Sequence, residues 1–307
     1  MIEDKKQEEQ KEQVDFRCGF VSIVGRPNVG KSTLLNKILG QKIAITANKP
    51  QTTRNRVLGI HTTENAQTLF LDTPGIHRAR GKLNQYMVDQ ALSACSGVDL
   101  ILLVTDATAP GKSDDFILQI LAQNQIPVVL LINKIDRIEK TVLLPLMAHY
   151  HEAFDFAGII PICAADGGGV NELLHQVESM LPLGPMLYPE DSVTDLPERF
   201  IVAEMIREKV LRRTHHELPY GVAVEVESFA ERERDGLISI QAVIYVGRDA
   251  HKRILVGKGG SMVRALGTDA RHEIERFLDA KVYLELFVKV KKNWTESDRA
   301  LKELGYN

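Results

Sequence analysis

Cysteine is scarce in this chain, and so are long apolar runs. The 307 residues include only Cys18, Cys95 and Cys163, which are too few and too scattered for a disulfide framework or a zinc cluster. No apolar stretch reaches the roughly 18 residues that a membrane-spanning helix requires. The polar N-terminal stretch also lacks the apolar core of a secretion signal. These absences favour a reducing compartment, with the cytoplasm as the default location.

An excess of charge of either sign is absent as well. The chain has 38 Lys or Arg against 41 Asp or Glu, a formal net charge of −3. No overall field therefore marks it as a nucleic-acid or membrane binder, and any such site must be local. The length favours two domains, each with its own core. No coiled-coil heptads occur, so we expect a monomer.

Prolines and local composition divide the chain. Four prolines lie between residues 182 and 197, where they cannot continue a helix or a central strand. We therefore predict a linker over 182–198. A disordered tail is expected over 1–16, a first domain over 17–181 and a second over 199–307.

The first domain alternates short apolar runs with helical patterns. The predicted strands are Phe20 to Val24, Thr68 to Leu71, Leu100 to Thr105, Val128 to Ile132 and Ile159 to Ile162. Several lack polar alternation, as parallel strands buried on both faces do, and the intervals between them suit crossover helices. The predicted fold class is α/β, a doubly wound sheet followed by a smaller α+β domain.

The strongest motif is Gly25-Arg-Pro-Asn-Val-Gly30-Lys31-Ser32, which matches G-x-x-x-x-G-K-[ST] between a strand and a helical pattern. Glycines let the backbone wrap around phosphates, Lys31 neutralises β/γ-phosphate charge, and Ser32 offers an oxygen to Mg²⁺. The motif predicts a nucleoside triphosphate site. Its predicted phosphate-binding residues are Gly25, Asn28, Val29, Gly30, Lys31, Ser32 and Thr33.

A carboxylate follows the second predicted strand, in Asp72-Thr-Pro-Gly75. Asp72 stands where a Mg²⁺ partner is needed, and the amide of Gly75 where a γ-phosphate would be sensed. Alone, this tetrapeptide is also a common turn. It becomes informative only beside the phosphate loop.

The base is predicted from Asn133-Lys134-Ile135-Asp136. The carboxylate of Asp136 can accept both N1–H and the exocyclic amine of guanine, a donor pair that adenine lacks. Asn133 can hold the neighbouring loop through its amide, and the stem of Lys134 can cover the ring. The loop formed by Cys163, Ala164 and Ala165 follows another strand, where a backbone amide could donate to guanine O6.

Together these segments resemble the translation-factor-related GTPases across residues 20 to about 180. In that resemblance Pro50 to Arg54 corresponds to the first switch loop, with Thr53 as the better candidate for the Mg²⁺-binding threonine and Thr52 as the alternative. The implied catalytic residues are Lys31, Thr53 and Gly75.

Two positions set this chain apart from Ras-like enzymes. Ile76 stands where they have a water-orienting glutamine, so we expect slow intrinsic turnover. Asn28 stands where potassium-stimulated relatives carry asparagine, so K⁺ is an expected second ion beside Mg²⁺.

The second domain carries Gly257-Lys258-Gly259-Gly260 between two helical segments. The predicted order is a helix at Arg199 to Arg213, strands at Tyr220 to Phe229 and Leu237 to Val246, helices before Gly257 and after Ser261, and a strand at Val282 to Val290. This αββααβ order resembles a type II KH domain, whose glycine loop lets an RNA backbone approach closely.

Local charge supports a phosphate-bearing partner for this domain. Residues 245–292 contain 11 Lys or Arg against 6 Asp or Glu. The predicted RNA-binding residues are Arg253, Gly257, Lys258, Gly259 and Gly260, with Ile254, Leu255 and Val256 as a candidate apolar floor. Trp294 could stack on a base or cover the domain edge, and we favour covering.

Over nearly its whole length the chain resembles those members of the TrmE-Era-like GTPase family that end in a type II KH domain. The resemblance implies binding of GTP and GDP, binding of the 3′ end of 16S-type rRNA, assistance to 30S subunit assembly, and peripheral association with the inner face of the cell membrane. Two rivals stay open. One is a P-loop kinase or ATPase, and the other is a GTPase of membranes or tRNA modification whose second half only docks proteins.

Overall fold

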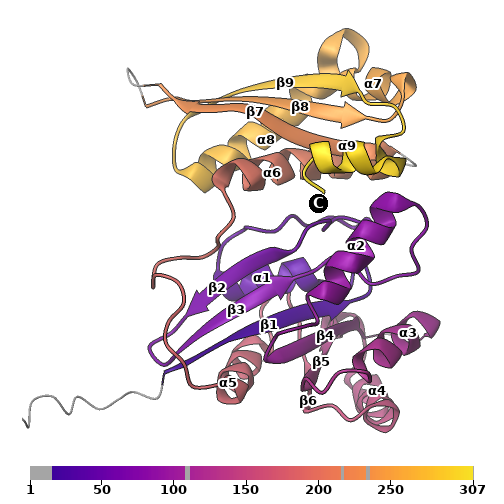
Figure 1. Cartoon of the computed structure of the whole chain (residues 1–307), viewed down its shortest axis with the longest axis vertical. Coiled ribbons are helices and arrows are strands. Elements are labelled where there is room, and N and C mark those ends of the chain that lie inside the picture. The colour runs from indigo at the N-terminus through magenta and orange to yellow at the C-terminus, as the bar shows by residue number, and fades with distance from the viewer. Residues whose placement is uncertain (1–15, 108–110, 216–217, 233–235, 307) are drawn as a thin grey trace, which may run out of the picture.

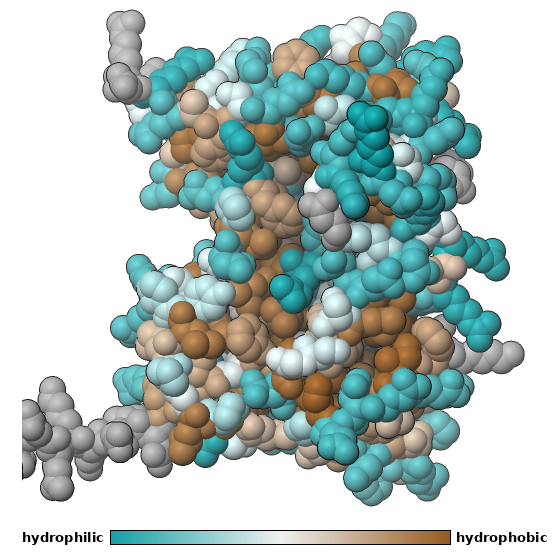
Figure 2. Space-filling view, viewed as in Figure 1, coloured by the Kyte–Doolittle hydropathy of each residue, from teal (hydrophilic) through white to brown (hydrophobic). Residues whose placement is uncertain are grey.

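The computed structural model describes residues 16–107, 111–215, 218–232 and 236–306. The chain folds into two lobes (Figure 1), which meet at a narrower waist where apolar atoms are visible between polar rims (Figure 2). The predicted tail, apart from Phe16, lies outside the described residues. Phe16 itself packs against the core of the first lobe, so the packed chain begins one residue before the predicted boundary.

A six-stranded sheet forms the first lobe, in the order β2-β3-β1-β4-β5-β6. Its strands are β1 (Arg17–Gly25), β2 (Val57–Thr62), β3 (Ala66–Asp72), β4 (Leu100–Asp106), β5 (Val128–Asn133) and β6 (Gly158–Pro161). Its helices are α1 (Lys31–Leu39), α2 (Lys82–Ser93), α3 (Lys112–Leu121), α4 (Lys140–Ala153) and α5 (Val170–Met180). All five predicted strands are confirmed, and so is the predicted α/β fold class with its doubly wound sheet.

Helices cover both faces of this sheet, which explains the strands' continuous apolar sequences. Along β4, Leu100 and Leu102 face the cluster that contains Leu34 of α1 and Leu173 of α5. Their neighbours Ile101 and Leu103 face the opposite cluster, built with α2, α3 and α4. Because β3 and β5 are buried at every position and β4 at all but its last, these strands show no polar alternation in the sequence.

Strand β2 was not predicted. It pairs antiparallel with β3, whereas β1, β3, β4, β5 and β6 are mutually parallel. Its sequence, Val57-Leu-Gly-Ile-His-Thr62, carries a central glycine, which weakens a strand signal. Here pairing with β3 decides the structure, and the segment that reaches β2 is the predicted switch loop.

The proline-rich connection runs along the first lobe. After α5 the carbonyl of Val193 accepts from the amide of Ile60 at 2.8 Å, and Thr194 Oγ1 donates to the carbonyl of Leu58 at 2.6 Å. These contacts lie on the free edge of β2, so the connection caps an edge strand that would otherwise be exposed.

The second lobe has the predicted αββααβ order. It comprises α6 (Glu198–Arg213), β7 (Val222–Glu231), β8 (Ile238–Val246), α7 (Asp249–Val256), α8 (Ser261–Leu278) and β9 (Val282–Val290). Strand β7 is antiparallel to β8, and β9 is parallel to it. Helices α6 and α8 pack on one face of the three strands around a single apolar core.

A short C-terminal segment packs between the two lobes. The turn Trp294–Glu296 and helix α9 (Asp298–Glu303) place Trp294 and Tyr306 in one apolar cluster with Leu83 and Met87 of α2. Trp294 has 0% exposure and its Nε1 donates to the carbonyl of Gly221 at 3.1 Å. Trp294 therefore covers a domain edge, the favoured alternative. Among the described residues, no helix is long and apolar enough to cross a membrane.

Candidate nucleotide pocket and glycine loop

A cavity of about 510 Å³ opens at the carboxyl ends of the parallel strands. Loops after β1, β5 and β6 meet there, as expected for the ligand edge of an open α/β sheet. The structure brings together in its lining most of the predicted nucleotide residues: Asn28, Gly30, Lys31, Ser32, Thr33, Asn133, Lys134, Asp136, Cys163, Ala164 and Ala165. Gly25 is the last residue of β1, and Val29 is buried in the loop between β1 and α1.

The phosphate loop wraps tightly before α1. Gly30 has φ 107°, and a Cβ there would lie 2.3 Å from Nδ2 of Asn133, so only glycine fits. Lys31 is buried, and its Nζ donates to the carbonyls of Gly25 at 3.2 Å and Arg26 at 2.9 Å. Burial lowers the pKa of Lys31 to about 8, against the opposing effect of Asp72.

Three oxygen-bearing side chains converge beside Lys31. Ser32 Oγ lies 2.8 Å from Thr53 Oγ1 and donates to Asp72 Oδ2 at 2.6 Å. The other oxygen of Asp72, Oδ1, is buried without a hydrogen-bond partner in the described part of the chain. Burial raises the pKa of Asp72 to about 6, opposed by Lys31 and Ser32. Two hydroxyls and an unsatisfied carboxylate oxygen fit a hard divalent cation.

The two switch-loop threonines point in different directions. Thr53 Oγ1 contacts Ser32, whereas Thr52 Oγ1 donates to the carbonyl of Lys49 at 2.6 Å. The hydroxyl of Thr52 is thus used within its own loop. Of the two alternatives, this geometry favours Thr53 as the residue that reaches the cation.

Gly75 and Ile76 lie against the phosphate loop through their backbones. The amide of Ile76 donates to the carbonyl of Gly25 at 3.0 Å, and Gly75 abuts Pro27 so closely that a Cβ would lie 2.5 Å from its nitrogen. The side chain of Ile76 has 1% exposure and belongs to the core under α2 and α3. It therefore faces away from the pocket as well as lacking a polar group.

Asn133 ties the base side of the pocket together. Its Nδ2 donates to the carbonyl of Val29 at 2.8 Å, while its Oδ1 accepts from the amides of Lys134 at 2.8 Å and Ala164 at 2.9 Å. One buried amide thus fixes three loops at once. Asp136 lines the same cavity, where Cys163 Sγ lies 3.3 Å from its Oδ1.

Sequence reasoning missed part of the lining. The cavity is also lined by Arg137, by Leu211 and Arg212 of α6, and by Thr46, Ala47, Asn48 and Lys49. The last four directly precede the predicted loop of residues 50–54 in the same irregular segment, so the switch loop from here on means residues 46–54. Residues 46–49 could have been predicted from the sequence, because they lie just before Thr52. Nothing near Leu211 and Arg212 in the sequence indicates a nucleotide, because α6 belongs to the second lobe.

The switch loop reaches into the second lobe through Arg54. This side chain is 1% exposed, and its Nη1 donates to the carbonyl of Val222 at 2.7 Å and to Tyr306 Oη at 3.1 Å. Nη2 donates to the carbonyl of Tyr220 at 3.1 Å. The guanidinium also lies 5.7 Å from the ring centre of Trp294 and 5.9 Å from that of Tyr306.

The predicted RNA-binding loop lies between α7 and α8. Gly257, Gly259 and Gly260 all have positive φ, and nothing lies within 4 Å of a Cβ at Gly259. Lys258 and Arg253 are exposed, and Arg264 Nη2 donates to the carbonyl of Gly259 at 2.6 Å. The apolar floor is only partly as predicted: Ile254 is exposed, but Leu255 is buried in the core.

Two known families match the two lobes. The family described as 50S ribosome-binding GTPase matches residues 20–134, and the KH domain family matches residues 217–295. The chain is 56% identical over 292 residues to the GTPase Era of Geobacter metallireducens, which covers 95% of this chain and 98% of that protein. It is 46% identical over 296 residues to the GTPase Era of Lactobacillus helveticus, covering 96% and 98%.

Solved structures agree over the same length. Era in complex with MgGDPNP and nucleotides 1506–1542 of 16S ribosomal RNA has a TM-score of 0.92 to this chain at 39% identity, covering 95% of this chain and 99% of that one. A variant of Aquifex aeolicus Era bound to GDP and AlF4⁻ gives 0.92 at 38% identity, with the same coverage. The likeness therefore extends across both lobes, and the chain belongs to the Era family of GTPases.

Proposed function

We propose that this GTPase is a GTP-gated RNA-binding switch that binds the 3′ end of small-subunit rRNA and assists assembly of the 30S subunit. The observation that carries the proposal is the path of the switch loop. Its Thr53 meets the phosphate loop and its next residue, Arg54, is buried in the KH domain. The relative bound to MgGDPNP and 16S rRNA supports both ligands.

In this proposal each pocket residue has a distinct role. Lys31 neutralises charge on the β/γ-phosphates, the amide of Gly75 binds the γ-phosphate, and Asp136 accepts from guanine. Ser32, Thr53 and Asp72 would hold Mg²⁺, which supplies electrostatic stabilisation of the phosphate charge that develops during hydrolysis. Because Ile76 is buried, water must be oriented by backbone, an ion, another switch residue or a bound partner.

Magnesium dependence is expected to titrate with Asp72. A proton and a cation compete for its carboxylate, and its pKa in the metal-free protein is about 6. The Mg²⁺ concentration for half-maximal binding of GDPNP should therefore rise as pH falls from 7.5 to 5.5, by about 4-fold on a single-site basis. Calorimetric titration measures this. Asp72→Asn should bind Mg²⁺ weakly at both values, and a pH-independent wild type would contradict the prediction.

Potassium is the second expected ion. Asn28 lines the pocket with φ 64°, and its carbonyl accepts from Lys134 Nζ at 2.6 Å. We expect turnover in K⁺ to exceed that in Na⁺ at equal ionic strength by about 10-fold, because a cation beside the phosphates supplies charge that Ile76 cannot. Phosphate release in the two salts measures it, and equal rates would remove K⁺ from the proposal.

The RNA function is tested by binding of the full protein to a short RNA that matches the 3′ end of 16S rRNA. With GDPNP we expect tighter binding than with GDP. Gly259→Asp should weaken RNA binding by about 10-fold or more, because it adds negative charge where the phosphate backbone must approach. Affinity for GTP should be unchanged.

The matched control is Gly236→Asp. Gly236 has φ 63°, close to the 59° of Gly259, and lies in the β7–β8 connection away from the loop. It should bind RNA like the wild type. Absence of sequence-selective RNA binding in every nucleotide state would leave the GTPase standing and favour a protein-docking role for the KH domain. A monomeric state, a cytoplasmic location and peripheral membrane association belong to the same proposal.

A further inference from the structure

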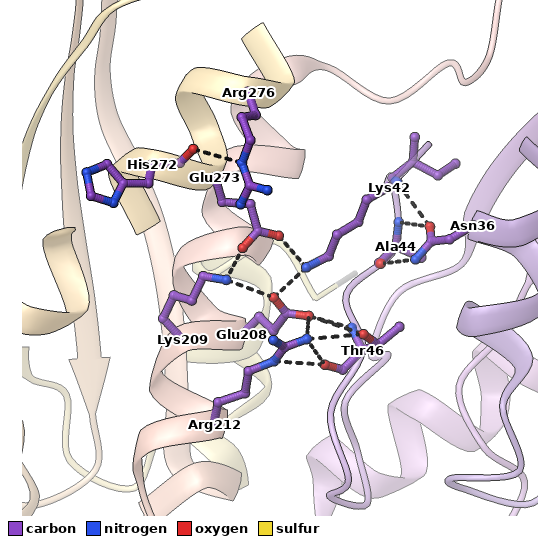
Figure 3. Close-up of polar contacts among 11 residues, drawn as sticks. Asn36, Lys42, Ala44, Thr46, Glu208, Lys209, Arg212, His272, Glu273 and Arg276 are labelled. Atoms are coloured by element: carbon purple, nitrogen blue, oxygen red, sulfur yellow. Dashed lines mark hydrogen bonds and ion pairs between the residues drawn. The ribbon is translucent and has the colours of Figure 1, made fainter. Parts of the chain in front are cut away.

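Helix α6 of the KH domain packs along the outer side of the switch loop. Glu208, fully buried, accepts from the amide of Thr46 at 2.8 Å, and Arg212 Nη2 donates to the carbonyl of Thr46 at 3.1 Å. Figure 3 shows Glu208 at the centre of this contact, with Lys42 approaching from the first lobe at 2.5 Å. The beginning of the loop is therefore anchored to α6 at both backbone polar groups of one residue.

In this contact two carboxylates pair with three cationic side chains. Glu273 of α8 pairs with both Lys42 and Lys209, and Glu208 pairs with Lys42, Lys209 and Arg212 (Figure 3). Burial alone would raise the pKa of Glu208, but Lys42 and the amide of Thr46 lower it below its usual value. Glu208 is thus an ionised, fully paired acceptor.

Arg207, the residue directly before Glu208 in α6, anchors the end of the loop. The guanidinium is 0% exposed and its Nη2 donates to the carbonyl of Thr52. Glu204 holds it in a two-point pair, with Nε at 2.7 Å and Nη2 at 2.5 Å. This fork fixes the plane of the guanidinium, so the direction of the second N–H of Nη2, which bonds the carbonyl of Thr52, is set by α6 and not by the loop.

The anchored carbonyl immediately precedes Thr53. A peptide plane held at Thr52 restricts where the next side chain can point. In this arrangement Thr53 Oγ1 lies 2.8 Å from Ser32 Oγ, which itself donates to Asp72, and these three side chains form the set that fits a divalent cation. Contacts from the second lobe thus orient a cation ligand of the first.

We propose that α6 is a structural part of the nucleotide site, with Arg207 as the positioning residue that holds Thr53 ready for the cation of a bound triphosphate. The inference rests on the proposed Mg²⁺ role of Thr53. The position of Thr53 is then fixed by the KH domain, because the loop residues between Thr46 and Thr52 belong to no helix or strand of the first lobe.

The consequence is a selective effect on the triphosphate state. A nucleoside diphosphate does not need the switch threonine, so only triphosphate binding draws on the order that Arg207 supplies. By reciprocity, a bound triphosphate tightens the contact between the loop and α6 by the same factor. Typical coupling of this kind is about 5- to 150-fold.

The experiment measures GDPNP and GDP affinities of the full chain, each with Mg²⁺ and with EDTA. The variants are Arg207→Met and the double variant Glu204→Gln/Arg207→Met, which leaves no unpaired carboxylate and keeps the test valid if the single variant does not fold. Both should lower the ratio of GDPNP to GDP affinity in Mg²⁺ by about 10-fold. In EDTA the ratio should match the wild type.

Arg213→Met is the matched control. Arg213 is an exposed arginine of the same helix, and its Nη2 pairs with Asp269 at 2.5 Å inside the KH domain. It should leave both affinities unchanged. Arg207→Lys should fall between wild type and Arg207→Met, because an ammonium keeps the charge but not the fork.

Two results would overturn the inference. Equal losses for GDPNP and GDP would show general damage to the pocket, and an unchanged ratio in the double variant would show that Thr53 is positioned without α6. A wild type that binds GDPNP without any Mg²⁺ dependence would instead refute the proposed cation role of Thr53, which is a separate failure.

Discussion

Replacing Arg54 by methionine should lower the free energy of unfolding by about 2–4 kcal/mol, because it leaves buried backbone carbonyls of the KH domain without a donor. Those carbonyls belong to Val222 and Tyr220, and the substitution also removes the cation stacked beside Trp294 and Tyr306. Such a stack contributes about 2 kcal/mol when it is desolvated. The desolvation penalty of Arg54 itself, which is recovered, keeps the net loss below the sum.

Trp294 makes the measurement specific to the interface. It is the single tryptophan of the chain and is fully buried against Arg54. In urea, its fluorescence transition in Arg54→Met should move to lower concentration, ahead of the loss of helical circular dichroism. A coincident shift of both signals would mean that the two lobes of the variant unfold as one unit, which would contradict this prediction.

Arg56→Met is the control for this substitution. Arg56 lies two residues further along the same loop and is exposed. It should change stability by less than about 0.5 kcal/mol, as is usual for surface positions. If both variants are destabilised equally, the loop tolerates neither change and the contribution of the buried guanidinium is not the cause.

Local patterns predicted what lies close together in the sequence. The phosphate loop, the Asn133 to Asp136 segment and the glycine loop are each set by consecutive residues, and each lies at the junction of elements where the sequence placed it. Apolar runs such as 128–132 identified buried strands because helices cover both faces of the sheet. The αββααβ order followed from the same signals.

Long-range contacts account for what was missed. Strand β2 exists through its pairing with β3, and its central glycine weakens the local signal. Arg207 reaches Thr52 across 155 positions of the chain. In the sequence it is one of several basic residues on a helix, where solvation is the ordinary explanation. Its burial and its bond to a switch-loop carbonyl depend on how the two domains pack against each other.

The choice between Thr52 and Thr53 also depends on long-range contacts that the sequence does not reveal. Both are β-branched threonines in one loop, and the motif alone leaves either as the cation ligand. Packing separates them, because Thr52 bonds within the loop while its carbonyl is held by Arg207, and Thr53 is turned toward Ser32. The choice therefore depends on α6, more than 140 residues away.

Asp136→Asn should change the nucleotide preference from guanine to xanthine. The carboxylate of Asp136 is placed in the pocket whose loops Asn133 holds together. A carboxylate only accepts, and guanine offers two donors, N1–H and the exocyclic amine. An amide presents one donor and one acceptor, so its NH₂ would face the exocyclic amine of guanine. We expect GTP affinity to fall by about 100-fold or more, since the exocyclic amine of the bound guanine loses its acceptor and faces a second donor.

Xanthine carries a carbonyl where guanine carries that amine, so it matches the amide's donor and acceptor together. Competition of GTP and XTP against a fluorescent nucleotide should show XTP preferred by Asp136→Asn and GTP by the wild type. Asp155→Asn, at an exposed aspartate of the same domain, should keep the wild-type order. If Asp136→Asn loses both nucleotides equally, Asp136 supports the loop and does not read the base. If it keeps GTP, the preference for guanine over adenine must come from the backbone amides of the Cys163 to Ala165 loop. These amides can contact O6, but they do not contact the exocyclic amine.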